Sequence, residues 1–542
     1  MPQKQNVKRS SEEFDFIVIG AGSAGAIVAS RLSEDGRFSV LVLEAGGWDR
    51  SPWIHIPLGV GKTIMNRKVN WAYETEPQAE LAGRRIYMAR GKVIGGSGAI
   101  NGMVHIRGHR QDFDGWADSG CNGWHWDGVL PYFRKSEDHY LGENEMHGTG
   151  GPVAVSKPTD HLDICSAFIE SGANWGLPRN DDFNAGTQEG IGHYDLTVRR
   201  GLRSNSAKGA LRPARDRRNL SVEVNACVQR ILFDNHRAVG LEYRHARGAS
   251  IQARARREIV LCSGAVNTPQ LLMLSGIGPA QHLESIGINA LADRTQVGRN
   301  LQDHLAVRVI CRTRQPITLN DQLSSWRGKA AIGAKFLFQR RGPLTFATGQ
   351  TGMFFKTQDT LPFADAQAFF MPFSTPGIGK NPHRFSAFSV SVSQCWPTSR
   401  GHIELRDANP HTAPAIQPNY LSTATDQEFY QRALPMLREV LATDPIESLI
   451  LDEYQPGATV TSPADILRFV REKASTIYHP CGTCRMGNDA DAVVDTRLRV
   501  LGIDGLRIAD ASIMPRIISG NINAACLMIG EKAADMILAD HS

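Results

Sequence analysis

The sequence lacks any apolar run long enough to cross a lipid bilayer, so no membrane-spanning helix is expected. Its first eleven residues are polar and basic. They do not form the apolar stretch of a secretory signal, and they predict a disordered leader. We therefore expect a cytoplasmic protein without an integral membrane segment, and peripheral association with the inner membrane stays open.

Paired cysteines and a strong charge of one sign are also missing. The nine cysteines are an odd number and widely scattered, which is typical of a reducing compartment. Cys481 and Cys484 have the spacing of a metal or redox motif, but no second such pair accompanies them, so we predict no metal site.

The net charge is only +5, and the densest basic stretch (residues 244–257) lies between strand-like runs. This stretch predicts a solvated hairpin and argues against a nucleic-acid interface.

Length and texture predict two interleaved domains, because 542 residues exceed what one ordinary hydrophobic core holds. Three segments have the sequence pattern of one nucleotide-binding domain: 1–155, 196–305 and 476–542. The other two segments, 156–195 and 306–475, are expected to form a substrate-binding domain. Alternating polar and apolar residues at 384–392 and 401–406 predict antiparallel strands in that second domain.

The most informative feature that is present is a three-glycine motif between a strand-like run and a helix-like run. Gly20 allows the tight turn, Gly22 lets the backbone approach a pyrophosphate, and Gly25 lets the helix pack close to the strand. The pyrophosphate then lies on the free N–H groups at the helix N-terminus. A second strand ends about twenty residues later at Glu44, whose carboxylate can accept hydrogen bonds from a ribose diol. The motif predicts dinucleotide binding and fits FAD and NAD equally.

Several further segments combine small residues with polar groups. Residues 89–102 contain many glycines together with apolar residues that should be buried, which predicts a loop that lies against a flat cofactor. Residues 262–279 predict a strand, a small-residue turn and a helix that starts at Pro269. The remaining segments of this kind are 297–304, 478–487 and 509–525.

On these segments the chain resembles the glucose–methanol–choline (GMC) oxidoreductases, a family of FAD-dependent alcohol oxidases and dehydrogenases. Residues 90–104 match its first signature and residues 264–278 its second, and the similarity covers essentially the whole length after residue 13. Within the family, the chain is most similar to bacterial choline dehydrogenase-type sequences. The resemblance implies an α/β fold, in which a Rossmann-like FAD-binding domain is interleaved with an α+β substrate domain built on a largely antiparallel sheet.

The resemblance also implies oxidation of a primary alcohol to an aldehyde, with hydride transfer to flavin N5. His479 stands where the family keeps its active-site histidine, and Asn523 stands where the second member of the pair lies. An imidazole suits removal of the hydroxyl proton near neutral pH, and an amide can hydrogen-bond the substrate oxygen as negative charge develops. The other sixteen of the 17 histidines are expected to be structural or on the surface. Choline dehydrogenase proper and a hydroxynitrile lyase-type enzyme stay open as alternatives.

FAD is the cofactor that the resemblance implies. Its contacts are expected at Gly20, Gly22, Ser23, Ala24, Gly25, Glu44, Ala45, Trp71, Arg90, Gly91, Val93, Gly95, Gly96, Ser97, Asn101, Gly102, Val104, Val228, Ser263, Asp510, Ala511, Asn521 and Ala524. Some relatives attach FAD covalently through a histidine in the first glycine-rich loop. The matching residue is Ile100, which cannot form that bond, so non-covalent FAD is expected.

Gln350 and Tyr478 are expected to line the substrate pocket. Choline-oxidising relatives place a glutamate near the trimethylammonium group, and the matching residue is the neutral Gln350. The missing charge favours a neutral primary alcohol over choline. The expected partners are therefore a small-molecule alcohol and an electron acceptor, which is either dioxygen or a quinone or soluble carrier.

Overall fold

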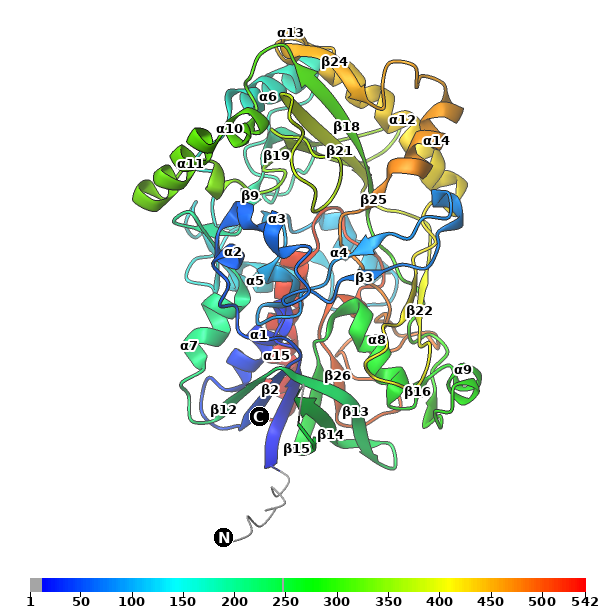
Figure 1. The fold of residues 1–542 in the computed structure, drawn as a ribbon. Coiled ribbons are helices and arrows are strands. Elements are labelled where there is room, and N and C mark those ends of the chain that lie inside the picture. The colour runs from blue at the N-terminus through cyan, green and yellow to red at the C-terminus, as the bar shows by residue number, and fades with distance from the viewer. Residues whose placement is uncertain (1–11, 246–247) are drawn as a thin grey trace, which may run out of the picture.

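The computed structural model describes residues 12–245 and 248–542. The leader predicted at 1–11 and Arg247 of the basic hairpin lie outside the described residues. Figure 1 shows an elongated molecule with one large sheet in its lower half and a second in its upper half. Among the described helices, none is both long and apolar enough to cross a membrane.

The lower sheet has the predicted Rossmann-like character. Its strands follow the order β12 (Leu220–Val224), β2 (Val40–Glu44), β1 (Glu12–Ile19), β15 (Ser250–Leu261), β14 (Arg237–His245) and β13 (Ala226–Asp234). β26 (Leu506–Ile508) also pairs with β15. The pairs from β12 to β15 and on to β26 are parallel, whereas β15, β14 and β13 form an antiparallel meander. All residues of β2 are buried, as expected for a parallel strand covered on both faces.

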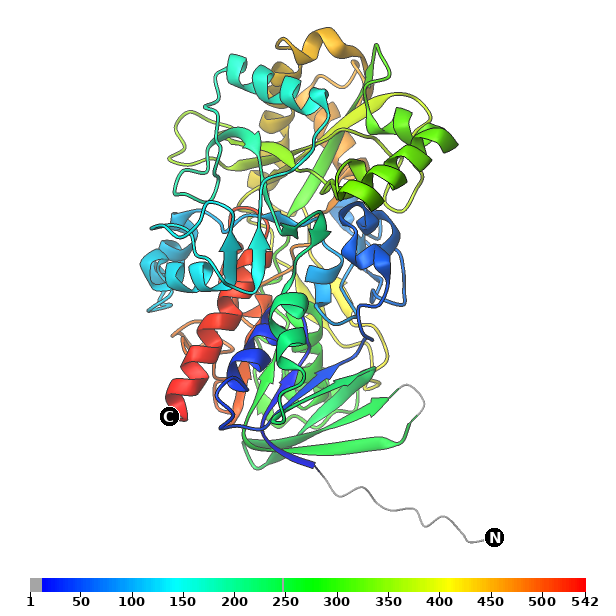
Figure 2. The same ribbon diagram turned by 90° about the vertical axis from the view of Figure 1, so that its left-hand side faces the viewer.

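Two helices at opposite ends of the chain pack side by side on this sheet. α1 (Ser23–Leu32) follows β1 directly, and α15 (Asn523–Asp540) is the last helix of the chain. Figure 2 shows α1 in blue beside α15 in red, and the two helices are in contact. Close packing of α1 depends on Gly25, because a Cβ there would lie 2.0 Å from the carbonyl oxygen of Gly20.

The upper sheet is antiparallel throughout. Its strands follow the order β24 (Ile450–Gln455), β18 (Leu305–Thr313), β21 (Ala387–Gln394), β20 (Ala366–Met371), β19 (Thr351–Phe355) and β8 (Gly190–His193). β25 (Ser475–Thr476) pairs with the start of β18. The three longest helices that contribute to the hydrophobic core of this sheet are α6 (Asp163–Trp175), α12 (Ala424–Leu441) and α14 (Pro463–Lys473).

The two faces of β18 have different neighbours because side chains alternate along a strand. Val307 and Val309 join the hydrophobic core beneath the helices. Ala306, Arg308 and Ile310 point the other way and line the large cavity described below. The upper sheet therefore supplies both a core and a wall of the candidate site.

Two predictions about elements are corrected. The helix expected to start at Pro269 is α8 (Gly264–Leu274), so Pro269 lies inside it. A proline leaves the carbonyl four residues earlier without its helical donor, and the Thr483 hydroxyl donates to that carbonyl, Ala265 O, at 2.7 Å. This tertiary hydrogen bond makes the internal proline tolerable.

The second correction concerns the alternating run at 401–406, which was assigned to the substrate domain. It contains β22 (His402–Glu404), which pairs with β23 (Ala415–Gln417) in a separate two-stranded sheet. Ile403 and Ile416 pack in the hydrophobic core of the lower sheet. Alternation predicted the strand, but it carries no information about which of two cores receives the apolar face.

Candidate active site

A single cavity of about 2220 Å³ lies between the two sheets and takes its walls from both. Small-molecule pockets usually measure about 300–1,000 Å³, so this cavity has room for an extended cofactor together with a substrate. The glycine-rich motifs of the lower sheet line one part of it. The face of β18 that carries Ala306, Arg308 and Ile310 lines another.

The lower part of the cavity is shaped for a dinucleotide. Gly22 caps α1 without any side-chain hydrogen bond, so the first N–H groups of that helix stay available to a phosphate. A Cβ on Gly22 would find no atom closer than 3.9 Å and would project into free space at the cavity wall. A Cβ on Gly96, in contrast, would lie 2.7 Å from Gly22 Cα, because the two glycine loops touch. These residues fit the pyrophosphate of FAD.

Most of the predicted FAD contacts line the cavity. They are Gly20, Gly22, Ser23, Ala24, Glu44, Ala45, Trp71, Arg90, Gly91, Gly96, Ser97, Asn101, Gly102, Val104, Val228, Ser263, Asp510, Ala511 and Asn521. The cavity lining does not include Gly25, Val93, Gly95 or Ala524. Gly25 serves the close packing of α1, and Val93 and Ala524 are buried in hydrophobic clusters. Ile100 lies in the cavity wall and offers no atom for a covalent bond to flavin.

Glu44 has a second task besides the predicted ribose contact. Its carboxylate accepts hydrogen bonds from the backbone N–H of Ala21 at 3.0 Å and of Gly46 at 2.8 Å. Burial raises the pKa of this carboxyl to about 7, against the opposing effect of these two hydrogen bonds. Glu44 therefore fixes the glycine turn to the end of β2 and presents its remaining lone pairs to the cavity.

His479 is held in place mainly through its backbone. The carboxylate of Asp303 accepts the His479 backbone N–H at 2.7 Å, and Arg90 donates to the carbonyl of Tyr478 at 2.6 Å. Tyr478 has φ +69°, an uncommon conformation for a residue with a side chain. Such a backbone persists only where its surroundings hold it, as Asp303 and Arg90 do here.

The hydrogen bonds of His304 determine which nitrogen of His479 is basic. His304 Nε2 lies 2.9 Å from the carbonyl oxygen of Cys395, which can only accept, so Nε2 carries the proton. Burial lowers the pKa of His304 to about 4, which leaves its Nδ1 as an acceptor at neutral pH. His479 Nδ1, at 2.9 Å, must then donate to it. The lone pair of the His479 ring is therefore on Nε2.

The structure corrects the predicted partner of His479. Asn521 Nδ2 lies 3.2 Å from His479 Nε2, and its Oδ1 accepts from Gln367 at 3.3 Å, which fixes the direction of the amide. Asn523 instead accepts a hydrogen bond from the Ser23 hydroxyl at 2.7 Å. Asn523 begins α15 and lines the cavity beside Ser23.

The pocket prediction holds a second correction. Tyr478 lines the cavity, but Gln350 does not belong to its lining. Gln350 is buried, and its amide donates to the carbonyl of Asp160 at 3.1 Å. A side chain other than Gln350 therefore determines whether the pocket favours choline or a neutral alcohol.

Sequence reasoning missed three polar residues at the site. Asp303 and His304 end a segment that had been singled out, but histidines other than His479 were expected to be structural or on the surface. Arg308 lies four residues later in the middle of an apolar strand. A cation in the middle of an otherwise apolar run, Leu305–Cys311, was the available signal for it.

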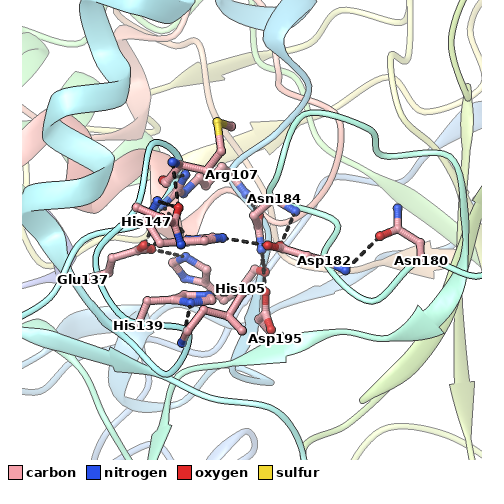
Figure 3. Close-up of polar contacts among 12 residues, drawn as sticks. His105, Arg107, Glu137, His139, His147, Asn180, Asp182, Asn184 and Asp195 are labelled. Carbon is pink, nitrogen blue, oxygen red and sulfur yellow. Dashed lines mark hydrogen bonds and ion pairs between the residues drawn. The ribbon is translucent and has the colours of Figure 1, made fainter.

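A second cluster of buried polar residues lies outside the cavity lining (Figure 3). Glu137, His139 and His147 present ligand atoms within 4.8 Å of one another, a spacing that could hold a metal ion. However, Glu137 Oε1 already accepts from Arg107 at 2.6 Å and contacts His147 Nδ1 at 3.0 Å. The other nitrogen of His147 lies 2.7 Å from Asp182. A metal ion would have to displace these partners, so the cluster is a set of internal ion pairs.

Comparison with known proteins agrees with this geometry. A family model described as GMC oxidoreductase matches residues 14–306, and a second model with that description matches residues 397–530. The chain is 42% identical over 537 residues to the mitochondrial choline dehydrogenase of Homo sapiens, covering 97% of this chain and 90% of that protein. It is 40% identical to the oxygen-dependent choline dehydrogenase of Brucella anthropi, covering 97% and 96%.

Solved structures share the fold over nearly the whole chain. Pyridoxine 4-oxidase from Mesorbium loti superimposes with a TM-score of 0.87 at 34% identity, covering 97% of this chain and 99% of that one. A formate oxidase superimposes with a TM-score of 0.91 at 28% identity, covering 98% and 99%.

Proposed function

This chain belongs to the GMC oxidoreductase family and is an FAD-dependent enzyme that oxidises alcohols; from that premise we propose that His479 is its general base and acts on a primary alcohol. The observation that carries the proposal is the hydrogen bond between His479 and His304. It leaves Nε2 of His479 as an unprotonated acceptor beside Asn521 and the cavity.

The proton of the alcohol has a suitable acceptor in this arrangement. The pKa of His479 lies well below its ordinary value, because burial, His304 and Arg90 all disfavour the charged imidazole. A neutral imidazole is ready to take a proton from a hydroxyl group bound at Nε2. Asn521 then donates its amide hydrogen to the substrate oxygen as that oxygen gains negative charge. The flavin of FAD supplies the acceptor for the hydride on the alcohol carbon.

We further propose that the two halves of the molecule have different roles. The lower sheet, with the two glycine loops and α15, binds FAD. The upper sheet supplies the cavity wall that contacts the alcohol. Residues 402–417, which contain β22 and β23, belong with the FAD-binding half. The free N–H groups at α1 and the side-chain wall of β18 support this division.

The test is anaerobic reduction of the flavin by a panel of primary alcohols, followed by stopped-flow absorbance. We expect His479→Ala to retain FAD and to slow reduction by roughly 10²–10⁴-fold, the usual loss for a positioned general base. Asn521→Ala should slow it on the order of a hundredfold, as for one donor to a developing oxyanion. Both groups serve one oxygen, so their effects should not simply add.

Asn523→Ala is the matched comparison. It removes the acceptor of Ser23 and should lower FAD retention while changing the reduction rate of loaded molecules less than Asn521→Ala does. Reduction at the wild-type rate in fully loaded His479→Ala would refute the proposed base. A flavin that stays oxidised with every alcohol would support the lyase alternative.

We also propose that the protein works in the cytoplasm at the periphery of the inner membrane, where a membrane quinone accepts its electrons. α11 (Trp326–Gln339) supports this proposal, because Trp326, Leu337 and Phe338 are 75%, 69% and 87% exposed. Residues 322–341 contain five cations and no carboxylate. Exposed aromatics on a basic helix are typical of binding to an anionic bilayer.

A further inference from the structure

We propose that the substrate of this enzyme is a primary alcohol that carries an anionic group, and that Arg308 binds this anion. The inference rests on the proposed function and specifies the substrate class of the same cavity. It runs against the names of the choline dehydrogenases in the comparison, because choline is a cation.

The guanidinium of Arg308 has no partner among the described residues. No hydrogen bond or ion pair of its side chain is present in residues 12–245 and 248–542, although the molecule contains many ion pairs of other arginines. Burial lowers the pKa of Arg308, and no carboxylate offsets that effect. Arg308 is half-buried in the cavity wall. An arginine cannot escape the cost of partial desolvation by losing its proton, so an unpaired guanidinium in such a wall calls for an anion.

The position of Arg308 points to the substrate and not to a structural partner. Arg308 lies on the cavity face of β18, between Ala306 and Ile310, and pairs across the sheet with Ser391, which also lines the cavity. His304, which contacts the catalytic His479, lies four residues earlier on the same chain segment. Four residues of extended chain span about 13 Å. His479 and Arg308 both line the cavity, so we infer that one small alcohol reaches both.

A second unpaired donor belongs to a residue that lines the same cavity. The hydroxyl group of Tyr478 is buried and has no hydrogen-bond partner among the described residues. Tyr478 lines the cavity as Arg308 does, and β25, which ends two residues before Tyr478, pairs with the start of β18. A guanidinium and a phenol from residues that line one cavity are the kinds of donor that a carboxylate or phosphate accepts.

The charge of the surrounding wall agrees with this assignment. Between residues 306 and 475 the cavity lining includes no Asp or Glu, whereas it includes six cations: Arg308, Lys329, Lys380, Arg384, Arg406 and Lys473. The carboxylates in the lining, Glu44, Glu74 and Asp510, come from outside that segment. A wall of one sign repels a quaternary ammonium group and attracts an anion.

The experiment uses three alcohols of one shape: 4-(hydroxymethyl)benzoate, 4-(hydroxymethyl)benzamide and 4-(hydroxymethyl)phenyltrimethylammonium. For the FAD-loaded enzyme, we expect the ratio of limiting reduction rate to half-saturating concentration to be about 10- to 100-fold higher for the carboxylate than for the amide. The trimethylammonium compound should be the poorest. Arg308→Gln should abolish the preference by weakening the carboxylate alone, and Arg308→Lys should keep part of it.

Arg312→Gln is the matched control, because it removes a cation from the same strand that lies outside the cavity lining and is already paired with Asp452. It should leave the preference within about threefold, since an exposed charge is screened. A wild-type enzyme that treats carboxylate and amide alike would overturn the inference. So would an Arg308→Gln variant that loses the same factor with all three alcohols, which would mean that Arg308 acts on the reaction in general.

Binding is measured separately from turnover, so that the two proposals fail in different ways. Benzoate, which has no hydroxyl group to oxidise, should bind the loaded enzyme by calorimetry at least about tenfold more tightly than benzamide, and Arg308→Gln should remove the difference. If no alcohol reduces the flavin but benzoate binds through Arg308, the proposed reaction is wrong and the anion site stands. If the amide reduces the flavin and benzoate does not bind, the anion site is wrong and the reaction stands.

Discussion

At the scale of single residues, the position of one proton decides what His479 can do. The chain from Cys395 O through His304 to His479 leaves Nε2 as the basic atom. Sequence could place His479 at the site through its resemblance to a family, but it could not show this chain of contacts. Asn521 and Asn523 illustrate the limit, because both lie in one segment and only the start of α15 determines which of them meets the imidazole.

The first prediction concerns the pH dependence of alcohol oxidation. Burial, His304 and Arg90 lower the pKa of His479, so its neutral, reactive form persists below the ordinary imidazole pKa of about 6.5. We expect the limiting rate of anaerobic flavin reduction to stay constant as pH falls through 6.5 and to decline only at clearly lower pH. An acid limb at or above pH 6.5 would contradict this assignment.

His304 variants test whether the second histidine sets the tautomer. His304→Leu removes the acceptor of His479 Nδ1–H and should slow reduction by about tenfold at every pH, because the wrong tautomer is then populated. His304→Gln offers an acceptor again and should restore most of the rate. A purely structural role would give two variants that lose FAD or melt early and that share the wild-type pH profile.

At the scale of elements, sequence patterns predicted strands and helices more reliably than their neighbours. The alternation in β21 arises because one side of the upper sheet is packed under helices and the other faces the cavity. The same kind of pattern in β22 did not reveal that Ile403 packs in the lower core. Pro269 likewise lies inside α8 because Thr483, more than two hundred residues away, bonds the freed carbonyl. Contacts between distant segments decide such cases.

The cluster of Figure 3 gives a prediction at this scale, because it joins β6 (Glu137–His139) to the segments that carry His147 and Asp182. Burial opposes protonation of His147, but its hydrogen bonds to Asp182 and Glu137 outweigh burial and raise its pKa. Because the pKa of His147 is higher in the folded protein than in the unfolded chain, protonation of His147 stabilises the fold. This contribution to the free energy of unfolding is complete below about pH 6.5 and is lost as the pH rises through the pKa of the folded state. We expect the apparent Tm to fall between pH 6 and pH 9.

His147→Gln should flatten this part of the profile, because its side chain does not titrate. His245→Gln is a matched control, since His245 lies at the surface beside Glu223. Its Tm profile should follow the wild type. A wild-type Tm that rises over the same pH range, or a His147→Gln profile that matches the wild type, would show that this histidine is not the titrating group.

At the scale of the whole molecule, α11 forms part of the cavity wall and also part of the surface proposed to bind a membrane. Lys329 and Ile332 of α11 line the cavity, while Trp326, Leu337 and Phe338 of that helix are exposed. Sequence predicted two interleaved parts but could not predict this arrangement, because it depends on where the two sheets meet. A surface that binds a bilayer here would bring the cavity wall close to a quinone dissolved in that bilayer.

The last prediction tests that surface with vesicles. The full-length, FAD-loaded protein should co-sediment with vesicles that contain phosphatidylglycerol and remain in the supernatant with neutral phosphatidylcholine vesicles. Each cation near an anionic surface contributes about 1 kcal/mol, and α11 and its C-terminal end together carry Arg327, Lys329, Lys335, Arg340 and Arg341. Binding should therefore weaken when the salt concentration rises.

Replacing Trp326, Leu337 and Phe338 by Ser should abolish co-sedimentation while leaving flavin reduction by alcohol unchanged, because these side chains point away from the cavity. Leu141→Ser with Leu451→Ser is the matched control, since these residues are 50% and 52% exposed and lie on other elements. Equal loss of binding in the control, or no binding of the wild type to anionic vesicles, would refute docking through α11 and would leave dioxygen or a soluble carrier as the acceptor.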